Sequence, residues 1–214
     1  MKADVAQSLH DDTLVRLMES VDQKFILEKY RVASEMKNRE RILAKQYHIR
    51  FLEAIEDETN KGLNSENISF QLYELLLQMY VPEKEALAFE KLKGLFSENA
   101  HLIRRLDQSL LLTQMINYTV KQINRGNASF YQKALELYKI GLDIGLVVEN
   151  QQIDAAVFGN IVLLGCNAQE FEWTGQFMEQ YQQYLKESIR QDTVALNTGL
   201  WYYHQNDFDK AYHQ

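Results

Sequence analysis

A single proline, Pro82, and nine glycines are all that the chain of 214 residues offers as strong helix breakers. Average proteins contain roughly 5% proline and 7% glycine, and an all-β sandwich needs a turn signal about every 8–12 residues. So few turn residues exclude a sandwich, a collagen-like chain and a flexible linker. The sequence therefore predicts an all-α fold, and its 46% of hydrophobic residues suffice to bury a core.

Charge and cysteine content restrict the setting of the chain. With 23 basic and 30 acidic residues the net charge is −7, whereas a nucleic-acid binder is usually basic. Cys166 is the only cysteine, so no intrachain disulfide can form. The start of the chain is polar, and its apolar runs are far shorter than the roughly 20 residues that span a bilayer. These features predict a cytoplasmic chain without a membrane partner.

Two regions, 1–64 and 65–214, differ in their apolar spacing. In the first, apolar residues recur every three or four positions and predict one long helix from about Gln23 to Glu58, either continuous or broken near Lys37 and Asn38. Asn60-Lys61-Gly62 is the expected stop.

The second region predicts shorter helices in pairs. Ser65 or Asn67 begins a helix that ends near Tyr80, and Pro82 begins the next. Residues 97–99 separate that helix from one ending at Asn124, where Gly126 provides a stop signal. Later helices are expected within residues 130–145, 153–165, 169–185, 191–205 and from 208 onward.

An internal repeat is clearest at the C-terminal end. A small residue, an aromatic residue, a turn residue, an aromatic residue and an alanine follow one another as Gly199, Tyr202, Asn206, Phe208 and Ala211. This segment resembles the tetratricopeptide repeat. Small residues suit the close crossing of two helices, aromatic residues fill the space beside them, and asparagine tolerates a left-handed turn.

Earlier copies are more divergent. Ala134, Thr174 and Ala211 are spaced by 40 and 37 residues, longer than the family's usual period of about 34, and the turn between Asn124 and Ser129 is extended. The layout is also similar to a group of uncharacterised bacterial helical-repeat proteins. The resemblance implies a right-handed α-solenoid of antiparallel helix pairs over 65–214.

One polar residue recurs in the predicted first helices of the pairs. The recurring residue is an asparagine, at positions Asn117, Asn160 and Asn197. Seven residues after each, on the same helix face, lie Asn124, Asn167 and His204. In tetratricopeptide domains the first helices line the concave surface, where such an asparagine often hydrogen-bonds the backbone of a bound peptide. The resemblance thus implies a protein- or peptide-binding scaffold whose contacts come from Asn160, Asn167, Asn197, Tyr203 and His204. In the alternative interpretation these asparagines bond to a neighbouring helix and fix the stacking.

The given sequence ends three residues after Ala211, inside a predicted second helix with no capping repeat. A solenoid needs a terminal repeat with a polar outer face. We therefore expect a fragment of a larger protein, or an end that another copy covers. An edge containing Trp201 and Phe208 would promote self-association.

No complete catalytic, cofactor or metal motif occurs. Glu98 and His101 have the spacing of one half of a di-iron site, but the required second half is missing, and a charged helix start explains them better. Cys166 follows an apolar stretch and is interpreted as a small core residue. The sequence predicts a non-enzymatic protein without catalytic, cofactor-binding or metal-binding residues.

A basic stretch supplies an alternative function. Lys37, Arg41 and Lys45 lie at steps of four on the predicted long helix, where they can bind nucleic acid or another acidic partner. A solvated face that pairs with Glu and Asp of adjoining helices is the favoured interpretation. A further alternative is a regulatory or structural part of a larger protein.

Overall fold

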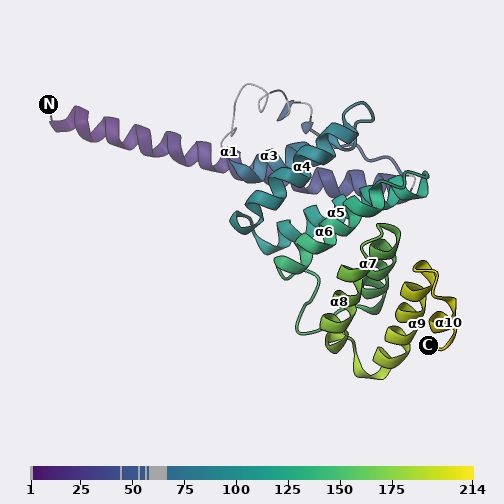
Figure 1. The fold of residues 1–214 in the computed structure, drawn as a ribbon. Helices are drawn as coiled ribbons and strands as arrows, with labels where there is room; N and C mark the ends of the chain where they lie inside the picture. The colour runs from purple at the N-terminus through teal and green to yellow at the C-terminus, as the bar shows by residue number, and fades with distance from the viewer. Residues whose placement is uncertain (1, 44, 53, 56, 58–66) are drawn as a thin grey trace. The chain divides into compact units, whose positions relative to one another are not determined.

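The computed structural model describes residues 2–43, 45–52, 54, 55, 57 and 67–214 (Figure 1). In these residues the regular structure is helical without strands, apart from an isolated bridge between Glu149 and Gln152. The all-α prediction is therefore confirmed. The chain divides into two compact units, Met1–Arg104 and Arg105–Gln214. The boundary expected between residues 64 and 65 lies outside the described residues, as do the candidate cap Ser65 and the stop at 60–62.

Among its described residues, the N-terminal unit includes the helices α1 (Lys2–Leu43), α3 (Ile68–Gln78) and α4 (Glu85–Asn99), and a short 3₁₀ helix, η1 (Ala100–Leu102). Helix α3 packs against both α1 and α4. Tyr30 of α1 and Phe70 of α3 are fully buried, with their rings edge to face at 6.1 Å. Asn67 caps α3, as predicted, because its side-chain oxygen accepts the backbone N–H of Ser69 at 3.0 Å.

The long helix was predicted with wrong bounds. It already includes Lys2, in a polar start without glycine or proline, and it ends at Leu43 instead of near Glu58. Beyond Leu43 the chain folds back: the carboxylate of Glu40 accepts the N–H of Tyr47 at 2.7 Å. The ammonium of Lys29 donates to the carbonyl of Arg50 at 3.2 Å. These hydrogen bonds join residues that are distant in the sequence, so the helical periodicity of apolar residues alone does not predict them.

Two further predicted bounds in this unit were wrong. Residues 82–84 form a turn before α4, and the N–H of Lys84 donates to the carbonyl of Val81 at 3.0 Å. The expected break at residues 97–99 is still helical, and the chain leaves α4 only at Ala100.

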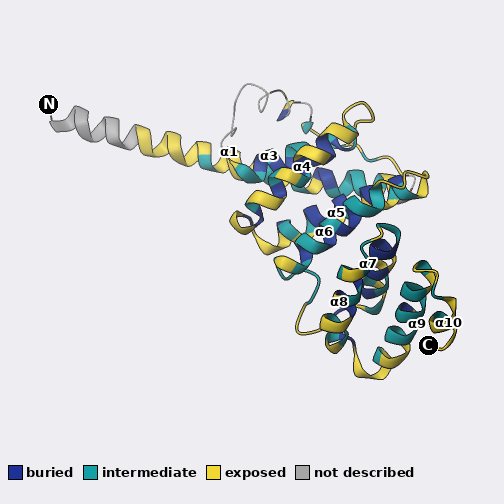
Figure 2. Cartoon of the chain, viewed as in Figure 1, coloured by how far each residue is buried: buried dark blue, intermediate teal, exposed yellow. Residues whose placement is uncertain are grey.

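The C-terminal unit consists of successive helix pairs: α5 (Arg105–Asn124) with α6 (Phe130–Asp143), α7 (Ala155–Asn167) with α8 (Phe171–Tyr181), and α9 (Glu187–His204) with α10 (Phe208–Tyr212). A 3₁₀ helix, η2 (Gln182–Tyr184), follows α8. Helix α7 also packs against α6 and α9, so each pair contacts the next along the chain. Figure 2 colours the buried residues of these helices dark blue. Fully buried Ala134, Leu135, Phe158, Ile161 and Val162 belong to this core.

The same type of turn connects the two helices in all three pairs of this unit. Its central residue is left-handed: Gly126, Gln169 and Asn206 have φ of 89°, 61° and 61°. In each turn, the residue after the left-handed one donates its backbone N–H to the carbonyl of the residue five positions before it. The three N···O distances are 3.1, 2.9 and 3.0 Å. This is the Schellman arrangement, which satisfies carbonyls at the end of a helix. The stop at Gly126 and the left-handed Asn206 are thereby confirmed.

Glycines lie at close helix contacts in all three pairs, and at Gly141 of α6 an added Cβ atom would lie 2.8 Å from the side chain of Leu112 on α5. A Cβ atom added to Gly199 would lie 3.4 Å from the carbonyl oxygen of Ala211, which confirms the predicted close approach. A Cβ atom added to Gly165 of α7 would lie only 2.0 Å from the hydroxyl oxygen of Thr174 of α8. The crossing of α7 and α8 therefore leaves no room for a side chain at position 165.

Candidate functional site

The predicted asparagine row keeps one register in the C-terminal unit. Counted back from the left-handed residue of each turn, Asn117, Asn160 and Asn197 all lie nine positions earlier, on α5, α7 and α9. The residues at the second position of the row, two places before the turn residue, are Asn124, Asn167 and His204. The repeat therefore places equivalent side chains at equivalent points of successive first helices.

The environments of these equivalent residues differ. Asn117 and Asn160 are exposed. The side chain of Asn160 hydrogen-bonds the hydroxyl of Tyr138 on α6. Burial raises the pKa of Tyr138, and the bond from Asn160 partly opposes this shift.

Asn197 is buried, with 5% of its surface exposed. Its amide donates to the carbonyl of Thr193 in its own helix at 2.8 Å, and its side-chain oxygen lies against Gly159 of α7. Asn167 also bonds within its helix, to the carbonyl of Leu163 at 2.8 Å. Asn197 is thus buried where α9 lies against α7, but its side-chain hydrogen bond to Thr193 stays within α9, whereas the stacking interpretation expected a bond to the neighbouring helix.

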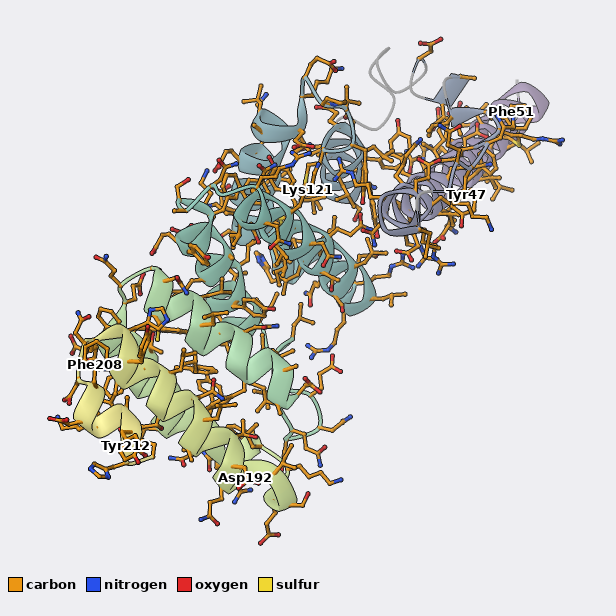
Figure 3. The ribbon with its side chains drawn as sticks, turned by 90° about the vertical axis from the view of Figure 1, so that its right-hand side faces the viewer. Tyr47, Phe51, Lys121, Asp192, Phe208 and Tyr212 are labelled. Carbon is orange, nitrogen blue, oxygen red and sulfur yellow. The ribbon has the colours of Figure 1, made fainter. Side chains whose placement is uncertain are left out.

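Tyr203 and His204 lie at the end of α9. Tyr203 belongs to an aromatic edge, defined here as Tyr203, Phe208 and Tyr212. The ring of Tyr203 is edge-on to His204 at 5.9 Å and to Phe208 at 5.6 Å. All three members of the edge are exposed, and Figure 3 shows Phe208 and Tyr212 on α10. Trp201, which the sequence suggested for this edge, is half-buried and donates its indole N–H to the carbonyl of Phe171 at 2.9 Å.

Sequence reasoning missed a groove of about 360 Å³ between α6 and α8. Its wall on α8 is a stack of aromatic rings, Trp173, Phe177 and Tyr181, with centroid distances of 5.5 and 5.0 Å between successive rings. Recurrence every four residues was the sequence signal for this wall. Residues Lys139, Leu142 and Asp143 of α6 form the opposite wall.

Charged groups flank the aromatic wall of this groove. The ammonium of Lys139 lies 4.5 Å from the centroid of Trp173 and forms an ion pair with Glu170. Hydrogen bonds from Lys139 and from Gln132 lower the pKa of Glu170. Burial, and to a smaller extent the carboxylate of Asp143, raise the pKa of Tyr181. The groove therefore combines an aromatic wall with the paired Lys139 and the carboxylate of Asp143 on its opposite wall.

The basic residues of α1 do not form the predicted continuous face. Because α1 ends at Leu43, Lys45 lies beyond the helix. Lys37 pairs with Glu40 at 2.8 Å, and Arg41 pairs with Glu85 at 3.3 Å while its guanidinium carbon lies 4.1 Å from the ring centroid of Tyr80. Both charges are thus paired with glutamates, but only Arg41 pairs with an adjoining helix, as the favoured interpretation expected, whereas the partner of Lys37 lies on α1 itself.

The structure also locates the groups considered for chemistry. Cys166 is buried, as predicted, and burial raises the pKa of its thiol to about 11, so the nucleophilic thiolate is scarce at neutral pH. Within the described part of the chain, no cluster of three or more His, Cys, Asp or Glu side chains could hold a metal ion. No helix in that part combines the length and apolar character needed to cross a membrane. Comparison with protein-family models, curated proteins and solved structures gives no match.

Proposed function

We propose that the chain is a non-enzymatic scaffold that binds an extended segment of a partner protein along the first helices of its C-terminal unit. The unit would be a right-handed solenoid of the tetratricopeptide type. The common turn of the three pairs, and the packing of each pair on the next, support this assignment. The register of the asparagine row is the observation that carries the binding proposal.

The exposed part of the row has the chemistry of a peptide-binding surface. The amide of Asn117 can donate to a carbonyl and accept from an N–H, the two groups that an extended peptide backbone presents, and Asn160 keeps a second N–H and its oxygen for this beside its bond to Tyr138. Three residues later, on the same helix face, lie Val120 and Leu163, with 44% and 41% of their surface exposed. An amide for the backbone and an apolar contact for a side chain thus recur on α5 and α7.

The third pair contributes differently to this proposal. Its asparagine, Asn197, is buried against Gly159 of α7, and the exposed Tyr203 and half-buried His204 extend the surface toward the C-terminal end. Rigid stacking makes such a surface preformed, so that the partner loses most of the conformational freedom on binding. We retain Asn167 as a flanking residue, because its amide is already used within α7.

A random peptide library displayed on phage provides the probe for this proposal. Peptides that the whole chain enriches would be synthesised, labelled and titrated by fluorescence polarisation. We expect Asn117→Ala and Asn160→Ala each to weaken binding about fivefold, since each removes a hydrogen bond worth about 1 kcal/mol. Circular dichroism of each variant checks that the fold is intact.

Gln180→Ala is the matched control, because it removes the same amide group from an exposed position in the groove between α6 and α8. Unchanged affinity in this variant, together with the losses at Asn117 and Asn160, supports the proposed surface. Affinity lost only in Gln180→Ala would place the peptide in the groove and overturn the proposal. Failure to enrich any peptide would overturn it as well.

A further inference from the structure

Helix α1 has two apolar faces, and only one of them is buried. Ile26, Tyr30 and Ala33 are buried where α1 packs on α3. The other face is an exposed stripe, defined here as Leu14, Met18, Val21 and Phe25. Each of these residues keeps 51–60% of its surface exposed. Figure 2 shows this part of α1 as exposed, and Figure 1 shows it extending past α3 and α4.

The exposed stripe is not a continuation of the core face. Successive helical residues turn by about 100°, which places all four side chains of the stripe within a sector of about 60°. The same rotation places Ile26, Tyr30 and Ala33 at least about 60° away from that sector. The stripe therefore requires a contact other than α3.

Isolation of this segment strengthens the argument. From residue 12 to residue 25 each side chain is exposed, except that of Ser20, which is half-buried. Val15 and Leu17, which flank the stripe, are also more than half exposed. Most helical stability in proteins comes from the packing of an apolar face, so this extension of α1 gains little until the stripe is covered.

We propose that the stripe pairs with the same stripe of a second copy of the chain as an antiparallel two-helix coiled coil. Its residues are separated by 4, 3 and 4 positions, the spacing of core positions in a coiled coil. This spacing reads the same in both directions. A two-fold axis between Met18 and Val21 then sets Met18 against Val21 of the partner subunit, and Leu14 against Phe25 of the partner subunit.

Charge favours the antiparallel arrangement over a parallel one. In a parallel pair, Lys24 would lie beside Lys29 of the partner subunit, and Glu28 would face Glu28 of the partner subunit. In the antiparallel pair, Lys24 lies beside Leu17 of the partner subunit, where its aliphatic part can cover apolar surface while the ammonium stays in water. Glu28 meets a like charge in either pair, because the antiparallel register sets it against Asp11 of the partner subunit, so the charge difference between the two pairs lies at Lys24.

The area of the stripe suffices for a dimer. The four side chains of the stripe and the flanking Val15 and Leu17 are each more than half exposed, and together they present on the order of 500 Å² of apolar surface. Two copies would therefore bury roughly 1,000 Å², the lower limit for a specific interface. We therefore expect a reversible dimer, independent of the peptide-binding function proposed above.

Sedimentation equilibrium of the whole chain over a concentration series tests the pairing. We expect dimer formation, and a dissociation constant that rises roughly a hundredfold or more in the double variant Met18→Glu, Val21→Glu, which buries charges at the two-fold axis. Gln23→Glu is the matched control: it adds the same charge on the opposite side of α1 and should leave the dimer intact. Since all three positions are exposed, circular dichroism should show an unchanged helical fold.

Oxidative cross-linking distinguishes the two orientations. Leu14→Cys mixed with Phe25→Cys should give a disulfide-linked heterodimer, and neither variant alone should cross-link to itself. Native Cys166 is buried and adds little background. A monomer at every concentration, or a dimer that tolerates the double variant, would overturn the pairing. Self-cross-linking of Leu14→Cys would overturn the antiparallel orientation.

Discussion

Substitution of Gly165 by alanine tests the close crossing of α7 and α8. The added methyl group would lie 2.0 Å from the hydroxyl oxygen of Thr174, 3.2 Å from its Cβ and 3.3 Å from its methyl carbon. Thr174 is fully buried, and its hydroxyl donates to the carbonyl of Glu170 at 2.7 Å. A rotation of the threonine side chain would move the hydroxyl away only by breaking its bond to Glu170, and the contact with its Cβ atom would remain tight at 3.2 Å, so the two helices must also move slightly apart.

The expected loss of stability is the difference between two effects. Overpacking a well-filled contact costs about 1–3 kcal/mol, whereas replacing a helical glycine by alanine favours the helix by about 0.5–1 kcal/mol. We expect Gly165→Ala to lower the free energy of unfolding by about 1–2 kcal/mol, and the midpoint of thermal unfolding by about 5 °C.

Urea denaturation monitored by tryptophan fluorescence measures the loss of stability in the unit that contains Gly165. Both tryptophans of the chain, Trp173 and Trp201, belong to the unit that contains Gly165. Gly94→Ala is the matched control, because Gly94 is exposed in α4 and an added Cβ would meet nothing within 4 Å. Circular dichroism should show that this variant is more stable by about 0.5–1 kcal/mol.

A double-mutant cycle decides whether the clash is the cause. Thr174→Ala removes the hydroxyl and methyl groups nearest to the added atom, so Gly165→Ala should cost at least about 1 kcal/mol less in that background. Equal costs in both backgrounds would refute the crossing as described. A stabilising effect of Gly165→Ala in the wild-type background would refute it too.

Further predictions concern the C-terminal unit. The lowered pKa of Glu170 stabilises the fold above its ordinary value of 4.5 and loses this contribution as pH falls through the folded-state value, so urea midpoints should fall more steeply below pH 4.5 in wild type than in Glu170→Gln. Cys166 should react with Ellman's reagent at pH 8 only after denaturation, because its pKa is about 11 and it is buried. Asp154 accepts N–H groups at 2.8 and 3.2 Å at the start of α7, so Asp154→Ala should lower the free energy of unfolding by about 1 kcal/mol, and Asp154→Asn by less.

Local signals in the sequence predicted much of the fold. The scarcity of proline and glycine indicated helices throughout, and Gly126 and Asn206 marked two of the left-handed turns. Gln169 adopts the same left-handed conformation without being a typical turn residue, and only the alignment of the repeat could suggest it. The end of α1 could not be predicted, because it depends on bonds such as that from Tyr47 back to Glu40.

The candidate site was less accessible to sequence reasoning for the same reason. Asn160 and Asn197 occupy the same register, yet one is exposed and the other is buried against Gly159. Periodicity assigns a residue to a helix face but does not show which helix covers that face. The groove between α6 and α8 combines Trp173 with Lys139, which lies on another helix, so its walls meet only through tertiary packing.

The turn that closes each helix pair has a kinetic consequence. Since the two helices of a pair are joined by a few residues, and each pair packs on its neighbour in the chain, native contacts of Arg105–Gln214 form between segments that are close in sequence. Closing such short loops costs little entropy, and helical proteins with local contacts fold in about microseconds to milliseconds. We therefore expect the first helix pair to form during synthesis, and each later pair to fold onto one that is already in place.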